Sequence, residues 1–419
     1  MQEFDLIVIG GGAAGFFGAI SCAEKCESDP KPKILILEAT NRVLTKVKVS
    51  GGGRCNVTHH QFEAKLLVQN YPRGQKELLG PFHKFQPKDT VNWFAEHGVT
   101  LKAEDDGRMF PTSNNSQTII DCLERTASQL SISLKKNSLV VDIKKNASDL
   151  FFLETKSGDK FISKKILIAT GSAPFGVKLA EILGHNLVSP VPSLFTFEIS
   201  NPLIKELSGT SFQNVQLDLK VGEKVFHQKG PCLITHWGLS GPAVLKLSAF
   251  AARELFQTNY KAELIVNWEQ GLSFEKAILN IEKIKKIHPK KKIVNENPFS
   301  FSKRFWDSLL LYLNIDENLI YADLNKKSIM DIAKAVTATK LFVNGKGVFK
   351  EEFVTAGGVS REEIDFRTLE SKLVKGLYFA GEILDVDGIT GGFNFQNAWT
   401  GSWLAGNDIA KKLLEKSST

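Results

Sequence analysis

Apolar runs alternate with helically spaced apolar residues over the first forty positions. Residues 4–9, FDLIVI, are an unbroken apolar run rich in branched side chains, which is typical of a strand buried on both faces of a parallel sheet. Residues 16–26, FFGAISCAEKC, repeat apolar positions at helical spacing, and residues 33–40, KILILEAT, form a second apolar run. The pattern predicts a strand, a glycine turn, a helix and a second strand in an α/β domain.

Similar signals return later in the chain. Residues 139–143, LVVDI, and residues 150–168 predict strands with a turn at Ser157–Gly158, and the last strand ends at residues 169–171, ATG. Glycine turns reappear after residue 354, with a short strand at 377–380 and a helix opened by Gly391 and Gly392. These segments read as two pieces of one domain.

The segment between these pieces has a different pattern. Residues 189–200 combine prolines with alternating apolar positions, Gly222 predicts a turn between strands, and Pro242 predicts the start of a helix. Residues 272–335 are rich in lysine and have helical spacing. We predict a first piece of a nucleotide-binding domain at 1–190, an inserted β-rich domain at 191–345 with a helical subdomain at about 260–335, and a second piece at 346–419.

The first glycine turn has the pattern of a dinucleotide site. Gly10 permits a tight turn, Gly12 leaves room for a pyrophosphate against backbone N–H groups, and Gly15 lets the helix pack close to the strand. Glu38 stands 23 residues after Gly15, at the end of the next strand, where an acid accepts hydrogen bonds from ribose hydroxyls. This context favours a dinucleotide site over a surface turn that is merely rich in glycine.

The late segment favours FAD over NAD as the dinucleotide. Flavoenzymes of the two-dinucleotide-binding type need a late segment that returns to the isoalloxazine ring, and residues 377–399, LYFAGEILDVDGITGGFNFQNAW, fit this need. The helix expected after Gly392 would point its first N–H groups at the O2/N1 edge of the flavin. We therefore expect FAD as the cofactor.

The amino-acid composition excludes few classes of protein. The 419 residues are 42% hydrophobic and 24% charged, as in ordinary globular proteins, and the net charge of +7 is compatible with a polyanionic partner without requiring one. Five cysteines without a CxxC pair argue against a zinc site or a disulfide framework, so we expect no metal and a reducing compartment. The N-terminus has no basic region before its short apolar run, and we expect a cytoplasmic protein.

Five motifs together resemble one known family. They are VIGGGAAG (8–15), KVKVSGGGRCNVT (46–58), THWGLSGPAVLKLS (235–248), VTAGGV (354–359) and AGEILDVDGITGGFNFQNAW (380–399). In this order the chain resembles the BaiN-like, or aminoacetone-oxidase-like, FAD flavoproteins, a family that includes ribosomal RNA dihydrouridine synthases. The resemblance implies a split Rossmann-like FAD domain of the two-dinucleotide-binding type, with an inserted β-barrel-like domain that carries a helical cap.

The resemblance and the motifs together give a set of expected cofactor contacts. The residues expected to bind FAD are Gly10, Gly12, Ala14, Gly15, Glu38, Ala39, Lys46, Gly51, Gly52, Arg54, Cys55, Asn56, Val141, Ala169, Thr170, Gly171, Gly381, Glu382, Asp385, Gly391, Gly392, Phe393 and Asn394. Relatives often have tyrosine in place of Phe393, so any hydroxyl contact from that ring is absent here.

Two residues are candidate proton donors. Cys55 follows the second glycine loop, and a thiol with a pKa of about 8.5 is a suitable acid at neutral pH. The alternative for Cys55 is a small buried residue behind the loop. His236 stands between a strand and the helix that Pro242 opens, and its alternative is a structural histidine.

The densest charge run lies in the expected helical cap. Its lysines are either RNA contacts or the solvated face of a helix: Lys283, Lys285, Lys286, Lys290, Lys291 and Lys292. No recognisable RNA-binding module accompanies them, so specificity would come from shape and a flipped base.

Three functions stay open from the sequence. The first is reduction of a carbon–carbon double bond in uridine of large-subunit ribosomal RNA, with hydride reaching C6 and a proton reaching C5. The second is oxidation or reduction of a small molecule, such as an aminoketone or an unsaturated acid. The third is a non-catalytic flavin- or RNA-binding protein. Only one strong dinucleotide fingerprint exists, so NAD(P)H, the expected electron donor, would bind transiently.

Overall fold

The computed structural model describes residues 1–26, 31–347 and 354–417. The chain divides into two compact units, the first made of Met1–Pro190 and Thr355–Thr419 and the second of Val191–Val354. We describe each unit by itself.

The main sheet of the first unit has a parallel centre. Its strand order is β19-β20-β21-β9-β1-β2-β6, and the pairs from β21 to β6 are all parallel. The hairpin β7–β8 extends antiparallel from β9. The strands are β1 Gln2–Ile9, β2 Ile34–Leu37, β6 Ser133–Lys135, β7 Val140–Lys145, β8 Phe151–Thr155, β9 Lys160–Ile168, β19 Ile364–Asp365, β20 Glu370–Ser371 and β21 Leu377–Phe379. Because β21 comes from the end of the chain and pairs with β9, the two sequence pieces share one sheet.

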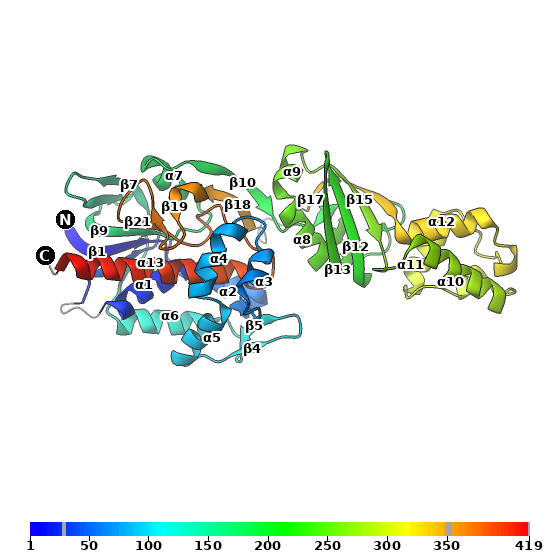
Figure 1. Ribbon diagram of the computed structural model, residues 1–419, viewed down its shortest axis with the longest axis horizontal. Helices are drawn as coiled ribbons and strands as arrows, with labels where there is room; N and C mark the ends of the chain where they lie inside the picture. Colours follow the sequence, from blue (N-terminus) through cyan, green and yellow to red (C-terminus); the bar gives the residue numbers. More distant parts are fainter. Residues whose placement is uncertain (27–30, 348–353, 418–419) are drawn as a thin grey trace. The chain divides into compact units, whose positions relative to one another are not determined.

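The first unit also contains helices. They are α1 Ala13–Lys25, α2 Thr45–Gly53, α3 Ala64–Leu67, α4 Gln75–Lys84, α5 Pro87–Glu96, α6 Gln117–Gln129, α7 Pro174–Ile182 and α13 Phe393–Ser417. The long α13 runs beside α1 (Figure 1). Glycine allows this close contact, since a Cβ built at Gly406 would lie 2.6 Å from the carbonyl oxygen of Gly18.

Two smaller sheets complete the first unit and its border. The strands β3 Thr58–His59, β4 Leu101–Ala103 and β5 Arg108–Pro111 form one sheet in the order β3-β5-β4. The strands β10 Leu187–Ser193 and β18 Val354–Val359 pair where the chain leaves and re-enters the first unit. This pairing places the two ends of the insertion next to each other.

The second unit is a curled sheet with helices. Its strand order is β16-β15-β12-β13-β14-β11-β17, an open path rather than a closed barrel. The first and last strands of this path are separated in the chain by Asn344 alone, whose N–H donates to the Glu198 carbonyl oxygen at 2.8 Å, so the sheet curls back on itself. The strands are β11 Phe197–Glu198, β12 Ser211–Val221, β13 Lys224–Ile234, β14 Gly238–Ser240, β15 Ala262–Asn267, β16 Thr339–Val343 and β17 Gly345–Lys346.

The helices of the second unit pack on one apolar core. They are α8 Pro242–Phe250, α9 Ala252–Gln257, α10 Phe274–Ile287, α11 Lys303–Tyr312 and α12 Lys326–Thr337. Trp268, Phe305 and Trp306 are buried in this core together with sheet residues such as Leu217 and Leu264. Within the described ranges, we find no helix with the length and apolar character that a bilayer crossing requires.

Candidate cofactor site

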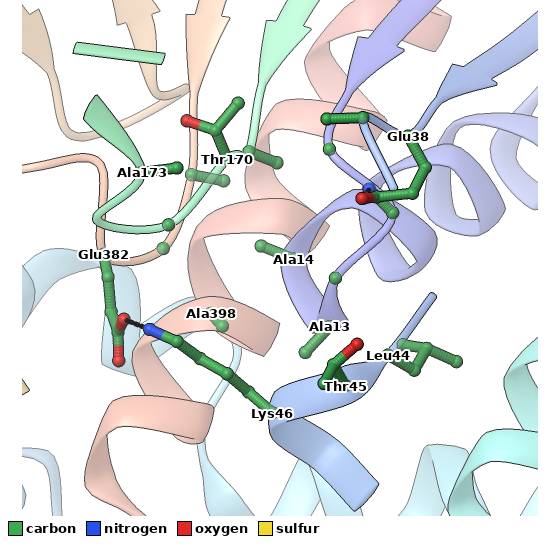
Figure 2. Close-up of a pocket in the computed structure, with 18 of the residues that line it drawn as sticks. Ala13, Ala14, Glu38, Leu44, Thr45, Lys46, Thr170, Ala173, Glu382 and Ala398 are labelled. Atoms are coloured by element: carbon green, nitrogen blue, oxygen red, sulfur yellow. Dashed lines mark hydrogen bonds and ion pairs between the residues drawn. The ribbon is translucent and has the colours of Figure 1, made fainter. Parts of the chain in front are cut away.

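A cavity of about 430 Å³ opens in the first unit beside the carboxyl ends of β1, β2, β9 and β21. This is the edge of a parallel sheet at which α/β folds bind ligands. The lining comes from four stretches of chain: Gly10, Gly11, Gly12, Ala13 and Ala14; Glu38, Ala39, Thr40, Arg42, Leu44, Thr45 and Lys46; Ala169, Thr170, Gly171, Ala173 and Phe175; Ala380, Gly381, Glu382, Asn394, Phe395 and Ala398. Figure 2 shows labelled residues from each stretch around one space.

The first glycine loop has the shape that a pyrophosphate needs. Gly10 has φ +112°, and a Cβ at Gly15 would lie 1.9 Å from the Gly10 carbonyl oxygen, so both positions require glycine. A Cβ at Gly12 would meet no atom within 4 Å, because this residue faces open space. Since Gly12 also lines the cavity, a side chain there would occupy space beside the N-terminus of α1. This cradle fits the pyrophosphate of FAD.

Glu38 ties the glycine loop to the end of β2. Its Oε2 accepts a hydrogen bond from the Gly11 N–H at 2.8 Å, and its Oε1 accepts from the N–H and Oγ1 of Thr40 at 2.8 and 2.9 Å. Oε2 accepts only the Gly11 N–H among the described hydrogen bonds, so it can accept a further one. The carboxylate is therefore oriented into a position suited to a ribose.

Lys46 and Glu382 form an ion pair between two walls of the cavity. Figure 2 shows the Lys46 side chain reaching from α2 to Glu382, which follows β21. The Lys46 side chain is 66% exposed and the Glu382 side chain 18%. The ion pair therefore links α2 to the turn that follows β21.

The second glycine loop does not line the cavity. Gly51, Gly52 and Gly53 follow one another with φ of +57°, +68° and +83°, a run that only glycine adopts readily. Arg54 is held by an ion pair to Glu104 at 2.6 Å and lies 4.0 Å above the Phe110 ring. Its guanidinium is thus committed to protein partners.

The second loop nevertheless meets the late segment. With its amide oriented to satisfy both ends, Asn56 donates to the Thr58 carbonyl oxygen at 3.0 Å and accepts from the Gly392 N–H at 2.9 Å. The indole Nε1 of Trp399 donates to the Val57 carbonyl oxygen at 2.9 Å. The chain therefore brings residues near 56 and residues near 392 into direct contact.

Residues 70–74 form a clamp on the late segment. Ile389 N–H donates to the Asn70 carbonyl oxygen at 2.9 Å, and the buried Tyr71 hydroxyl donates to the Phe393 carbonyl oxygen at 2.7 Å. Arg73 forms a buried two-point ion pair with Asp387. These contacts fix the turn from which α13 begins. Sequence reasoning missed this clamp because residues 70–74 carry no cofactor motif.

Two further contacts hold the same turn. Asp385 is 2% exposed and accepts from Arg361 Nε at 3.3 Å, while Arg361 also pairs with Glu77 at 3.1 Å. The Asn394 side chain bonds both the N–H and the carbonyl oxygen of Gly388 at 2.8 Å. Asp385 therefore faces an arginine and lies outside the cavity lining, whereas Asn394 both braces the turn and lines the cavity.

The two candidate proton donors have different environments. Cys55 is fully buried at φ +62°, and burial raises the pKa of its thiol to about 12, well above the ordinary value on which its candidacy was based. His236 is exposed at a turn of the second unit, in which Thr235 N–H donates to the Gly238 carbonyl oxygen at 2.8 Å.

The expected contact residues fall into two groups. Those that line the cavity are Gly10, Gly12, Ala14, Glu38, Ala39, Lys46, Ala169, Thr170, Gly171, Gly381, Glu382 and Asn394. Those outside its lining are Gly15, Gly51, Gly52, Arg54, Cys55, Asn56, Val141, Asp385, Gly391, Gly392 and Phe393. Val141 is 44% exposed on β7. Phe393 begins α13 and stacks on His59 at 4.6 Å.

The sequence analysis missed other lining residues. They include Thr40, Arg42, Thr45, Ala173, Phe175 and Ala398. Their position in the sequence could have indicated them, because each lies within four residues of an expected contact on the same stretch.

A Rossmann-like sheet, a glycine cradle beside Glu38 and a late turn at the cavity define the class: the protein is an FAD-dependent oxidoreductase. Residues 4–408 match the HI0933-like protein Rossmann domain, and the chain belongs to this family.

The curated relatives match nearly the whole chain. It is 29% identical over 420 residues to a ribosomal RNA dihydrouridine synthase of Escherichia coli, covering 98% of both chains. It is 27% identical to the Haemophilus influenzae protein of the same name, covering 98% of this chain and 100% of that one. It is 28% identical to a 3-dehydro-bile acid delta(4,6)-reductase of Clostridium scindens, covering 97% of this chain and 98% of that one.

Solved structures share the fold at low identity. A flavocytochrome c3 fumarate reductase in its open conformation gives a TM-score of 0.51 at 16% identity, over 99% of this chain and 79% of that one. The 3-ketosteroid-delta4-(5alpha)-dehydrogenase of Rhodococcus jostii gives 0.50 at 12% identity, over 98% of this chain and 97% of that one.

Proposed function

We propose that the protein reduces the C5–C6 double bond of uridine in large-subunit ribosomal RNA, in the cytoplasm, with NAD(P)H as the electron donor. The observation that carries this proposal is the match, over nearly the full length, to two proteins named ribosomal RNA dihydrouridine synthase. The reaction adds hydride at C6 and a proton at C5, so two electrons from NAD(P)H and one solvent-derived proton balance the product.

The first unit supplies the residues that would hold the cofactor. Bound FAD provides the two-electron hydride chemistry. The N–H of Gly12 and the N-terminus of α1 would hold the pyrophosphate, and Glu38 would accept the ribose hydroxyls. Lys46 and Glu382 would contact the middle of the cofactor, and the start of α13 would face the flavin ring.

Proton delivery to C5 is assigned to Cys55 or His236. A thiol with a pKa of about 12 holds its proton throughout the neutral range. Transfer of that proton would produce a buried thiolate, whose charge is costly to bury. His236 is exposed at a turn of the second unit, and an imidazole can carry a transferable proton. The variants Cys55→Ala and His236→Gln separate the two assignments, because only the donor's loss slows reoxidation of the reduced flavin by substrate.

The lysines of the second unit are proposed RNA contacts. Lys285 donates to the Leu324 carbonyl oxygen at 2.6 Å, Lys291 pairs with Glu296 at 2.5 Å, and Lys292 donates to Asn318 at 2.7 Å. Lys283, Lys286 and Lys290 are exposed on and after α10. These three exposed lysines are the stronger candidates for phosphate contacts.

Reduction of a small unsaturated molecule is the second candidate. The bile acid reductase of Clostridium scindens is as similar to this chain as the RNA-modifying relatives are. In that case the lysines near α10 are a solvated surface.

The deciding experiment is deletion of the gene, followed by mapping of dihydrouridine in large-subunit ribosomal RNA. We expect one or more dihydrouridines to disappear and to return with a plasmid copy. An unchanged modification profile contradicts the RNA substrate and leaves the small-molecule function. The purified protein should be yellow, and NADH and NADPH can be compared as donors by flavin bleaching.

A further inference from the structure

A second groove of about 490 Å³ lies in the first unit and takes no part in the cofactor site. Its cations come from four separate elements, namely the ends of α1 and α4, the loop between β19 and β20, and α13. The groove is lined by Lys25, Lys84, Arg367, Trp403, Leu404 and Lys411, among others. An aromatic side chain surrounded by cations is the composition of a single-stranded nucleic acid site.

The charge of the groove is positive. Its two acids are Asp408 and Glu415. Asp408 already accepts from the Tyr378 hydroxyl and pairs with Lys412, both at 2.7 Å, and Glu415 approaches Lys411 only to 3.9 Å. The four cations therefore outnumber the two acids, while Asp408 pairs with Lys412 and Arg367 with Asp365 outside the lining.

Arg367 and Lys84 remain accessible. Arg367 is 83% exposed although it pairs with Asp365 at 2.7 Å, and the exposed Lys84 donates to the Arg367 carbonyl oxygen at 3.2 Å. Exposed pairs of this kind contribute little energy and rearrange readily when a phosphate approaches. The groove can thus present several cations to one strand.

Trp403 gives the groove a stacking surface. One face of the indole stacks on Phe85, with ring centroids 5.2 Å apart and an interplanar angle of 25°. The side chain is half-buried and its remaining surface lines the groove. A base can stack on a flat ring that is already held in place by a second ring.

The groove and the cofactor cavity lie on opposite faces of α13. Phe395 and Ala398 line the cavity, whereas Trp403, Asn407 and Lys411 line the groove. At about 3.6 residues per turn these two sets point to roughly opposite sides of the helix. The occupant of the groove is therefore not the group that reacts.

We propose that this groove binds a single-stranded RNA segment that flanks the target uridine. The proposal rests on the RNA substrate assigned above. In this proposal the first unit binds the RNA together with the inserted domain.

The test compares two pairs of charge reversals in the full-length FAD-loaded protein. Lys84→Glu with Lys411→Glu changes the groove, and Lys144→Glu with Lys178→Glu changes exposed lysines of the same unit outside it. The probes are a labelled oligouridylate and a labelled fragment of large-subunit ribosomal RNA, followed by fluorescence anisotropy over a range of salt concentrations. FAD content and NAD(P)H oxidation are measured in parallel.

We expect the groove pair to weaken binding of both probes about tenfold or more at low salt and to lower the slope of log Kd against log salt by about 1 to 2. The control pair should have a much smaller effect, and both pairs should keep their FAD. Trp403→Leu should weaken oligouridylate binding about tenfold without changing the salt slope.

Two outcomes contradict the groove proposal, and a third contradicts the proposed function. Equal loss in the groove and control pairs overturns the groove proposal while the RNA substrate stands. Tighter binding of uridine monophosphate than of the oligonucleotide also overturns it, because the groove then takes a free nucleotide. Absence of RNA binding by the wild type, together with an unchanged dihydrouridine profile in the deletion strain, overturns the proposed function itself.

Discussion

At the scale of single residues, Glu38 and Cys55 show how far a side chain's surroundings change its chemistry. Glu38 lines the cavity while its carboxylate accepts hydrogen bonds from Gly11 and Thr40. Cys55 sits beside the cofactor motif in the sequence, but its thiol is buried and does not line the cavity. The first residue is well placed for binding, and the second has become a much weaker acid.

Glu38→Ala should weaken FAD binding about 10- to 100-fold, because hydrogen bonds to a charged group contribute about 1.5–3 kcal/mol each. The measurement is Kd from quenching of flavin fluorescence on titration of the apoprotein. Glu38→Gln keeps one acceptor oxygen and should therefore lose less affinity for FAD. An unchanged Kd in Glu38→Ala would remove the ribose role of this carboxylate.

If Cys55 is the proton donor, the rate of flavin reoxidation by substrate should not fall between pH 6 and 9. Burial raises the thiol pKa to about 12, so the thiol stays protonated across this range. Cys55→Ala should then slow reoxidation about 100-fold or more with FAD still bound. Cys122→Ala, another fully buried cysteine, is the matched control. A rate that falls with rising pH within this range contradicts Cys55 as the donor.

At the scale of elements, the turn between β21 and α13 depends on residues 70–77 more than on its own sequence. Backbone, hydroxyl and guanidinium contacts from this stretch hold residues 385–393. The turn delivers the first N–H groups of α13 to the cavity region. A small displacement there would move Asn394 and Phe395, which line the cavity.

Tyr71→Phe should weaken FAD binding severalfold, because it removes the 2.7 Å hydrogen bond to the Phe393 carbonyl oxygen at the start of α13. Tyr378→Phe is the matched control, since its hydroxyl makes a 2.7 Å bond to Asp408 away from the cavity. Each variant should lose about 1 kcal/mol of its free energy of unfolding and should therefore unfold at a lower temperature. Equal FAD affinity in the two variants would show that the Tyr71 contact serves stability alone.

At the scale of the whole molecule, the cofactor cavity belongs to one unit. Each residue of its lining lies in Met1–Pro190 or Thr355–Thr419. The inserted unit has its own core of Trp268, Phe305 and neighbouring residues. The lining of the cofactor cavity therefore draws on the first unit and not on the inserted one.

Replacement of residues 191–354 by a short glycine–serine linker should leave a protein that binds FAD and is yellow. The linker can be short because β10 and β18 pair at the border of the first unit. Flavin absorbance and circular dichroism check this outcome, and turnover of RNA should be lost. A colourless but folded product would mean that the insertion contributes directly to the cofactor site.

Local rules let the sequence alone determine the fold class and the centre of the cavity. Buried strands need continuous apolar runs, Gly10 and Gly15 lack the space for a Cβ, and Glu38 follows at the spacing of a βαβ unit. The tertiary structure alone decided that Arg54 pairs with Glu104, that Cys55 is buried, that Tyr71 and Arg73 brace a turn more than 300 residues away, and that four elements form a basic groove. Such contacts depend on how distant segments pack, and neither periodicity nor glycine spacing records that packing.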